Sequence, residues 1–208
     1  MFEILLAAFV LLFIVVDPIG VAAIFAALSH GAALSEQRRI ARNGVLLAAA
    51  ILITFMLGGG ALLTLVGISI PAFRIAGGIL LFILSLDMIF ARQSGLRATT
   101  LREQKEATKR QDISVFPLAF PLIAGPGAMT TVLLMASAGH GAGVMAGLIG
   151  VVILVLALTL LALWSAPVIV RGLGETGINV VNRLLGLILA ALAVQFILDG
   201  VRVGLGLG

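Results

Sequence analysis

Six apolar segments, each about 20 residues or longer, constrain the fold of this chain more than any other feature of its sequence. A helix needs about 20 apolar residues to cross the hydrocarbon core of a bilayer. Only 11% of the residues are charged, against about 25% in soluble domains. The sequence therefore predicts an all-α integral membrane protein that lies in the lipid bilayer as a single domain, residues 1–208. The six predicted transmembrane helices are roughly 2–29, 42–66, 72–91, 114–138, 143–170 and 180–203.

The distribution of basic residues predicts how these helices are oriented. All but two of the 13 Lys and Arg residues lie in or beside the connections 30–41, 92–113 and 171–179. Connections rich in Lys and Arg favour the cytoplasmic side of a membrane. We therefore expect these three connections in the cytoplasm and both termini in the periplasm of a bacterium, with the chain in the inner membrane. The same distribution leaves no basic face large enough for nucleic acid.

Two prolines interrupt apolar segments and predict breaks in the first and fourth spans. They occur in the pairs Asp17-Pro18 and Gly125-Pro126. Proline lacks a backbone N–H, clashes with the preceding helical turn, and drives the residue before it out of the α-helical region. It is nevertheless favoured at the first position of a helix, and Asp or Gly is accepted just before that position. Each pair therefore predicts a new half-helix that begins inside the membrane.

The two halves of the chain show a weak similarity at a nearly constant offset. Pro18 and Pro126 are 108 positions apart, and Arg74 and Arg183 are 109 positions apart. Each half contains three spans, and because three is odd, the second copy would be inverted relative to the first. The sequence thus predicts two inverted three-helix repeats. They cover about 1–92 and 114–208, with a charged connector at about 93–113 between them.

The residues around the two breaks are the predicted binding site for a small zwitterion. The N-terminus of a half-helix offers free N–H groups and a partial positive charge, which suit a carboxylate. Asp17 would add a negative charge for an amino group or for a coupling ion, H+ or Na+, unless it serves only as a helix cap. The predicted substrate-binding residues are Asp17, Pro18, Ile19, Gly20, Gly125, Pro126, Gly127, Ala128, Thr130, Thr131 and Gln195.

Other polar residues in the spans have simpler interpretations beside the functional ones. The hydroxyls of Thr130 and Thr131 face the cavity or bond to their own helix. Four charged residues near the ends of the third and sixth spans are candidates for structural or gating roles, although side chains there also extend to the interface. These four residues are Arg74, Asp87, Arg183 and Asp199.

Several kinds of chemistry have no support in the sequence. The chain has no Cys, and its two His residues, His30 and His140, fall at opposite ends of the predicted bundle. We therefore expect no metal site. No phosphate-binding loop or catalytic pair is present, so the sequence predicts neither a cofactor nor an enzyme.

Four motifs resemble those of the MarC family of bacterial inner-membrane proteins. They are 17-DPIG-20, 74-RIAGGIL-80, 117-PLAFPLIAGPGAMTTV-132 and 183-RLLGLILAALAVQFILDG-200. The resemblance covers essentially the whole chain. The family is similar to the LysE-type exporters, and some members look like neutral amino acid transporters. In this chain Asp17 stands where the family often has Asn.

The leading hypothesis is a secondary transporter that moves a small zwitterionic metabolite, such as a neutral amino acid, by alternating access. Homo-oligomers are compatible with this hypothesis. The alternative is a membrane protein without transport activity that docks partners through the charged segment 92–113. A membrane enzyme would need a catalytic pair that the sequence does not contain.

Overall fold

All regular elements in the described part of the chain are helices. The computed structural model describes residues 1–90, 113–137 and 141–206. Its elements are α1 (Phe2–Val16), α2 (Pro18–Leu28), α3 (Leu34–Val66), α4 (Ile70–Phe90), η1 (Ser114–Ile123), α6 (Pro126–Ser137), α7 (Ala142–Trp164) and α8 (Ala166–Gly204). Five helical segments are long and apolar enough to cross a membrane if α1 and α2 count as one, and the bent pair of η1 and α6 makes a sixth. The predicted all-helical membrane fold is confirmed. Of the predicted docking segment 92–113, residues 92–112 lie outside the part of the chain that the structure describes.

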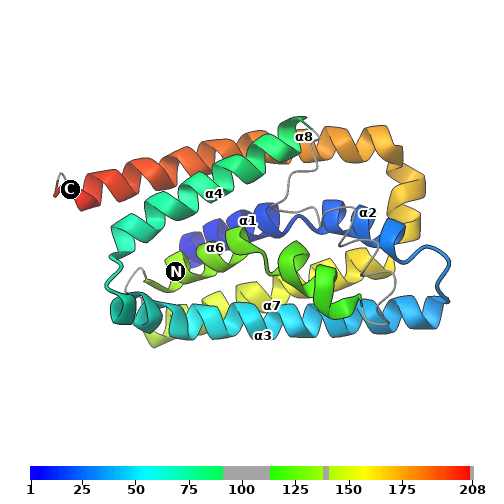
Figure 1. Ribbon diagram of the computed structural model, residues 1–208, viewed down its shortest axis with the longest axis horizontal. Helices are drawn as coiled ribbons and strands as arrows, with labels where there is room; N and C mark the ends of the chain where they lie inside the picture. The colour runs from blue at the N-terminus through cyan, green and yellow to red at the C-terminus, as the bar shows by residue number, and fades with distance from the viewer. Residues whose placement is uncertain (91–112, 138–140, 207–208) are drawn as a thin grey trace.

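The helices form three layers, with the two broken spans in the middle. In Figure 1, α4 and α8 lie along one side, α3 and α7 lie along the opposite side, and α1, α2 and α6 lie between them. Half of the most apolar window of the first span is buried, compared with 22–33% of that window in α3, α4, α7 and α8. The broken first span is therefore at the centre of the protein, and α3, α4, α7 and α8 are more exposed to the surroundings.

Glycines bring α4 and α8 into close antiparallel contact. A Cβ added at Gly78 would lie 2.8 Å from the backbone oxygen of Ala193, and one at Gly200 would lie 3.0 Å from that of Pro71. At the other end of the pair, a Cβ at Gly186 would lie 2.8 Å from Cβ of Met88. We call this contact, centred on Gly78, Gly186 and Gly200, the α4–α8 seam. Small residues of this kind let membrane helices pack backbone to backbone.

The seam gives a first testable prediction. Gly78→Ala should lower the thermal unfolding midpoint of the purified protein by several degrees, because the new methyl group meets a backbone oxygen that cannot rotate away. Overpacking of this kind costs about 1–3 kcal/mol, and each kcal/mol shifts the midpoint by about 2–4 °C at this chain length. Gly60→Ala is the matched control, because a Cβ there has open space around it. Equal midpoints for the two variants would contradict the tight seam.

Several predicted boundaries are wrong. The fifth span is shorter than expected, because α7 ends at Trp164, six residues before the predicted end, and α8 begins at Ala166. Pro167 explains the early start of α8, since proline is accepted in the first helical turn. Gly174, with non-helical torsion angles of φ 63° and ψ 176°, then divides α8 into a short first segment and a long second one, so a break does occur within the connection expected at 171–179, although no extended polar loop is present there. Likewise, α3 begins at Leu34, within the connection expected at 30–41.

Candidate functional site

Asp17 is the single residue between α1 and α2 and forms the first break. Its backbone N–H donates to the carbonyl of Phe13 at 2.9 Å and closes α1, while its own carbonyl accepts from the N–H of Val21 at 2.9 Å in α2. Its φ of 52° and ψ of 69° lie in the left-handed region, and no other non-glycine residue in the described ranges has a positive φ. Asp is one of the few residues that tolerate this region, and Pro18 starts the next helix.

The carboxylate of Asp17 caps α2 in a fully buried position. Its Oδ1 atom accepts a hydrogen bond from the backbone N–H of Gly20 at 3.0 Å, and none of the residue is exposed. A Cβ added at Gly20 would overlap Oδ2 of the same carboxylate. Gly20 is therefore the residue that allows the carboxylate to lie against the start of α2. Asp17 is therefore a helix cap, as one of the two interpretations predicted. Its carboxylate also lies buried at the centre of the bundle.

The second break is wider and differs in construction. η1 and α6 meet at an angle of 56°, and Ala124 and Gly125 lie between them. The carbonyl of Gly125 accepts from the N–H of Met129 at 3.0 Å and starts α6. A side chain at Gly125 would overlap the carbonyl oxygen of Pro121, so this position also requires glycine.

Before this break the chain is less regular than the predicted half-helix. Phe116 and Phe120, each followed by proline, have extended torsion angles near φ −132°, ψ 125° and φ −135°, ψ 129°. Steric contact with a following proline disfavours the α-helical region. The repeated Phe-Pro pairs at 116–117 and 120–121 are the sequence signal for this irregular segment.

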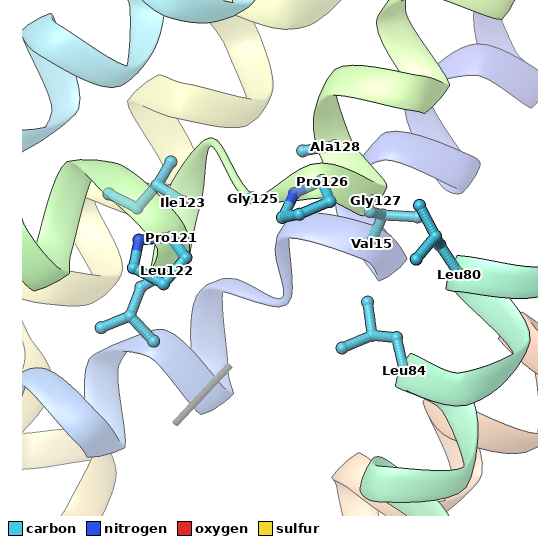
Figure 2. Close-up of a pocket in the computed structure, with 10 residues that line it drawn as sticks. All are labelled: Val15, Leu80, Leu84, Pro121, Leu122, Ile123, Gly125, Pro126, Gly127 and Ala128. Carbon is cyan, nitrogen blue, oxygen red and sulfur yellow. The ribbon is translucent and has the colours of Figure 1, made fainter. Parts of the chain in front are cut away.

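A small cavity lies beside the second break and reaches α1. Its volume is about 20 Å³, which is room for about one water molecule. A Cβ at Gly127 would lie 3.4 Å from Val15 and 3.0 Å from Leu81, which shows how closely α1, α4 and α6 meet at this point. Figure 2 shows Val15, two residues before Asp17, next to Gly127. The lining residues are Val15, Leu80, Leu84, Pro121, Leu122, Ile123, Gly125, Pro126, Gly127 and Ala128.

The structure brings together some of the predicted substrate-binding residues. Gly125, Pro126, Gly127 and Ala128 line the cavity. Asp17, Pro18, Ile19 and Gly20 form the first break, whose neighbour Val15 lines the same cavity. Val15 and the leucines of α4 could not be predicted as lining residues, because ordinary apolar residues in a span give no signal of their partners.

The two threonines after the second break have different surroundings. The hydroxyl of Thr131 is buried and donates to the carbonyl of Gly127 at 2.8 Å, which is the bond to its own helix that the sequence left open. Thr130 is also buried, and its methyl group packs directly on Gly77 of α4. Neither residue is among those that line the cavity.

The remaining predicted polar residues belong to α4 and α8. Gln195 is exposed on α8 and donates through Nε2 to Oδ1 of Asp199 at 2.8 Å, one helical turn away. The four residues expected to have structural or gating roles belong to α4 and α8: Arg74, Asp87, Arg183 and Asp199. Arg183 is exposed and the other three are partly buried. None of the five residues lines the cavity.

Comparisons with known proteins agree over nearly the whole chain. The chain is 38% identical to the UPF0056 membrane protein YvbG of Bacillus subtilis over 206 residues, which cover 97% of this chain and 96% of the relative. It is 36% identical to the UPF0056 membrane protein YhcE of Escherichia coli over 203 residues, covering 93% of this chain and 90% of the relative. No solved structure matches the chain. Residues 2–205 match the family described as MarC family integral membrane protein, and the chain therefore belongs to the MarC family of multi-pass integral membrane proteins.

Proposed function

We propose that this MarC family protein is a secondary transporter that moves a small zwitterion, such as a neutral amino acid, across a bacterial inner membrane by alternating access. The observation that supports the proposal most directly is the contact between the two breaks, where Val15 packs beside Gly127 at a cavity in the middle layer. Irregular backbone within a membrane is tolerated where protein or a cavity surrounds it, and transporters bind substrates at such places.

The two breaks provide complementary groups for a zwitterion. The start of α6 offers backbone N–H groups to a carboxylate, and Asp17 offers a buried negative charge to an amino group or to a coupling ion, H+ or Na+. The cavity holds only about one water molecule, so the structure corresponds to a closed state in this proposal. A zwitterion would enter after the helices that line the cavity have moved apart.

The packing of the helices supports the proposed inverted repeat. The first span contacts the fourth through α1 with α6 and α2 with η1, and the other two pairs of spans that the repeat would relate are also in contact, namely α3 with α7 and α4 with α8. Contacts between unlike helices also recur, because α2 packs on α8 as α6 packs on α4, and α2 packs on α7 as α6 packs on α3. Alternating access in such transporters is a rocking motion of one repeat against the other.

We also propose an orientation of the protein in the membrane. No residue is assigned a catalytic step. The connection at 30–41 and the short first segment of α8 would face the cytoplasm, because Arg38, Arg39 and Arg171 lie there and Arg42 follows directly after the connection. Both termini would then lie in the periplasm. Cysteine labelling of intact cells at the exposed positions Ser35 and Leu205 would test this orientation.

Flux measurements on the purified protein test the transport proposal. In liposomes that contain only this protein, at least one member of a panel of neutral amino acids should accumulate in response to an imposed H+ or Na+ gradient. An ionophore that collapses the gradient should stop the accumulation, and liposomes without protein are the control. Absence of gradient-dependent flux for the whole panel, and for related zwitterions, would exclude the proposed substrate class.

A further inference from the structure

Three arginines at the start of α3 form an exposed cationic surface. Arg38, Arg39 and Arg42 all have exposed side chains. Because successive residues turn by about 100° around a helix, the three lie within about one third of its circumference. Leu46 has the same angular position one turn further along and is 62% exposed. This side of α3 therefore passes directly from guanidinium groups to an apolar surface.

The apolar surface continues along the same side of α3. Ala50 and Leu57 follow Leu46 at the same angular positions, and Leu57 is 59% exposed. We call the surface formed by Arg38, Arg39, Arg42, Leu46, Ala50 and Leu57 the α3 basic face. Its cations are all at one end, and its remaining length is apolar.

Little within the described residues neutralises these cations. Among the three arginines, Arg39 forms an ion pair from its Nη2 to Oε1 of Glu36 at 3.6 Å, with side chains 63% and 48% exposed. An exposed pair of this kind contributes little and leaves the guanidinium accessible. In the ranges that the structure describes, neither Arg38 nor Arg42 has a carboxylate within 4.0 Å.

The length of α3 places the arginines at the level of the lipid headgroups. The helix has 33 residues and a length of about 50 Å, whereas the hydrocarbon core is about 30 Å thick. No charged residue occurs in α3 after Arg42, so the excess length belongs to the end with the arginines. Gln37 holds this end in place, because its Nε2 donates to the carbonyls of Ser29 at 3.2 Å and Ala32 at 3.0 Å.

We propose that the α3 basic face binds an anionic phospholipid. The guanidinium groups of Arg38, Arg39 and Arg42 hold the phosphate, which matches their planar arrangement of N–H donors. An acyl chain of the same lipid lies along Leu46, Ala50 and Leu57. The apolar surface one turn from the cations favours a lipid over a free phosphate ion. This site is separate from the cavity and does not depend on the proposed transport.

Native mass spectrometry with matched lipids tests the proposal. The full-length protein in detergent is mixed with equal amounts of phosphatidylglycerol and phosphatidylcholine that have identical acyl chains. The wild type should retain the anionic lipid in preference, and Arg38→Gln with Arg42→Gln should abolish most of that preference, at about fivefold for each arginine removed. Arg202→Gln, which removes an exposed arginine near the C-terminus, is the matched control and should leave the preference unchanged.

Salt and inorganic phosphate distinguish a lipid site from a site for any small anion. Retention of phosphatidylglycerol by the wild type should fall as the salt concentration rises, since exposed charges are screened. Inorganic phosphate in excess should not displace the lipid, because it has no acyl chain to lie along the apolar part of the α3 basic face. Equal retention of the two lipids by the wild type, an unchanged preference in the double variant, insensitivity to salt, or complete displacement by phosphate would each overturn the proposal.

Discussion

Gly20→Ala is expected to reduce gradient-driven flux strongly and to lower the thermal unfolding midpoint at the same time. The added Cβ would overlap Oδ2 of Asp17, so the carboxylate would have to leave its position above the start of α2. Its hydrogen bond from the N–H of Gly20 would then be lost in a fully buried place. The overlap disfavours the arrangement around Asp17 by about 1–3 kcal/mol, and because about 1.4 kcal/mol is a factor of ten, flux should fall about fivefold to hundredfold.

The control for Gly20→Ala is a glycine in a helix with room for a methyl group. Gly58→Ala meets no atom within 4 Å, and Ala has the higher helix propensity, so its flux should be normal and its unfolding midpoint equal or slightly higher. Initial rates in liposomes and thermal unfolding in detergent provide the two readouts. If Gly20→Ala and Gly58→Ala behaved alike in both, the position of the carboxylate would have no importance.

Asp17→Asn is expected to keep the fold while reducing flux about tenfold or more. The amide oxygen of Asn can accept from the N–H of Gly20 as Oδ1 does, and Asn tolerates the left-handed torsion angles found at this position. What the substitution removes is the negative charge, which in the proposed mechanism holds an amino group or a coupling ion. The measurement is the initial rate of flux as a function of the imposed gradient, with the unfolding midpoint as the test of folding.

Asp17→Ala completes this comparison by removing the cap as well. Loss of a helix cap costs about 0.5–2 kcal/mol, and a left-handed Ala adds about 1–2 kcal/mol of strain. The unfolding midpoint should therefore drop in Asp17→Ala and stay near that of the wild type in Asp17→Asn. Normal flux with normal gradient dependence in Asp17→Asn would reduce Asp17 to a structural cap.

The sequence predicts the two breaks because their cause is local. Pro18 and Pro126 cannot continue a helix that precedes them, and the residue before each must leave the α-helical region. The same argument applied to Pro117 and Pro121 would also have predicted the irregular first half of the fourth span. The end of the fifth span is local too, since Pro167 starts α8 soon after Trp164.

The cavity lining is a different matter, because it depends on which helices meet. Val15, Leu80 and Leu84 belong to two apolar spans in which most residues are alike, and only the folded arrangement brings them to Gly127. The exposed position of Gln195 is a similar case. A polar residue in a span predicts a partner, and here that partner is Asp199, one turn away on the same helix.

The α4–α8 seam has a mechanical consequence. At Gly78 and Gly200 one helix lies directly against backbone atoms of the other, so sliding of the two helices would drive packed backbone atoms into each other. We therefore expect α4 and the long second segment of α8 to move together as one rigid unit. Leu80 and Leu84 of α4 form one wall of the cavity, so any opening of the cavity on that side must displace α8 as well. A spectroscopic probe on the outer surface of α8, at exposed Leu187 for example, would report the opening from outside the site.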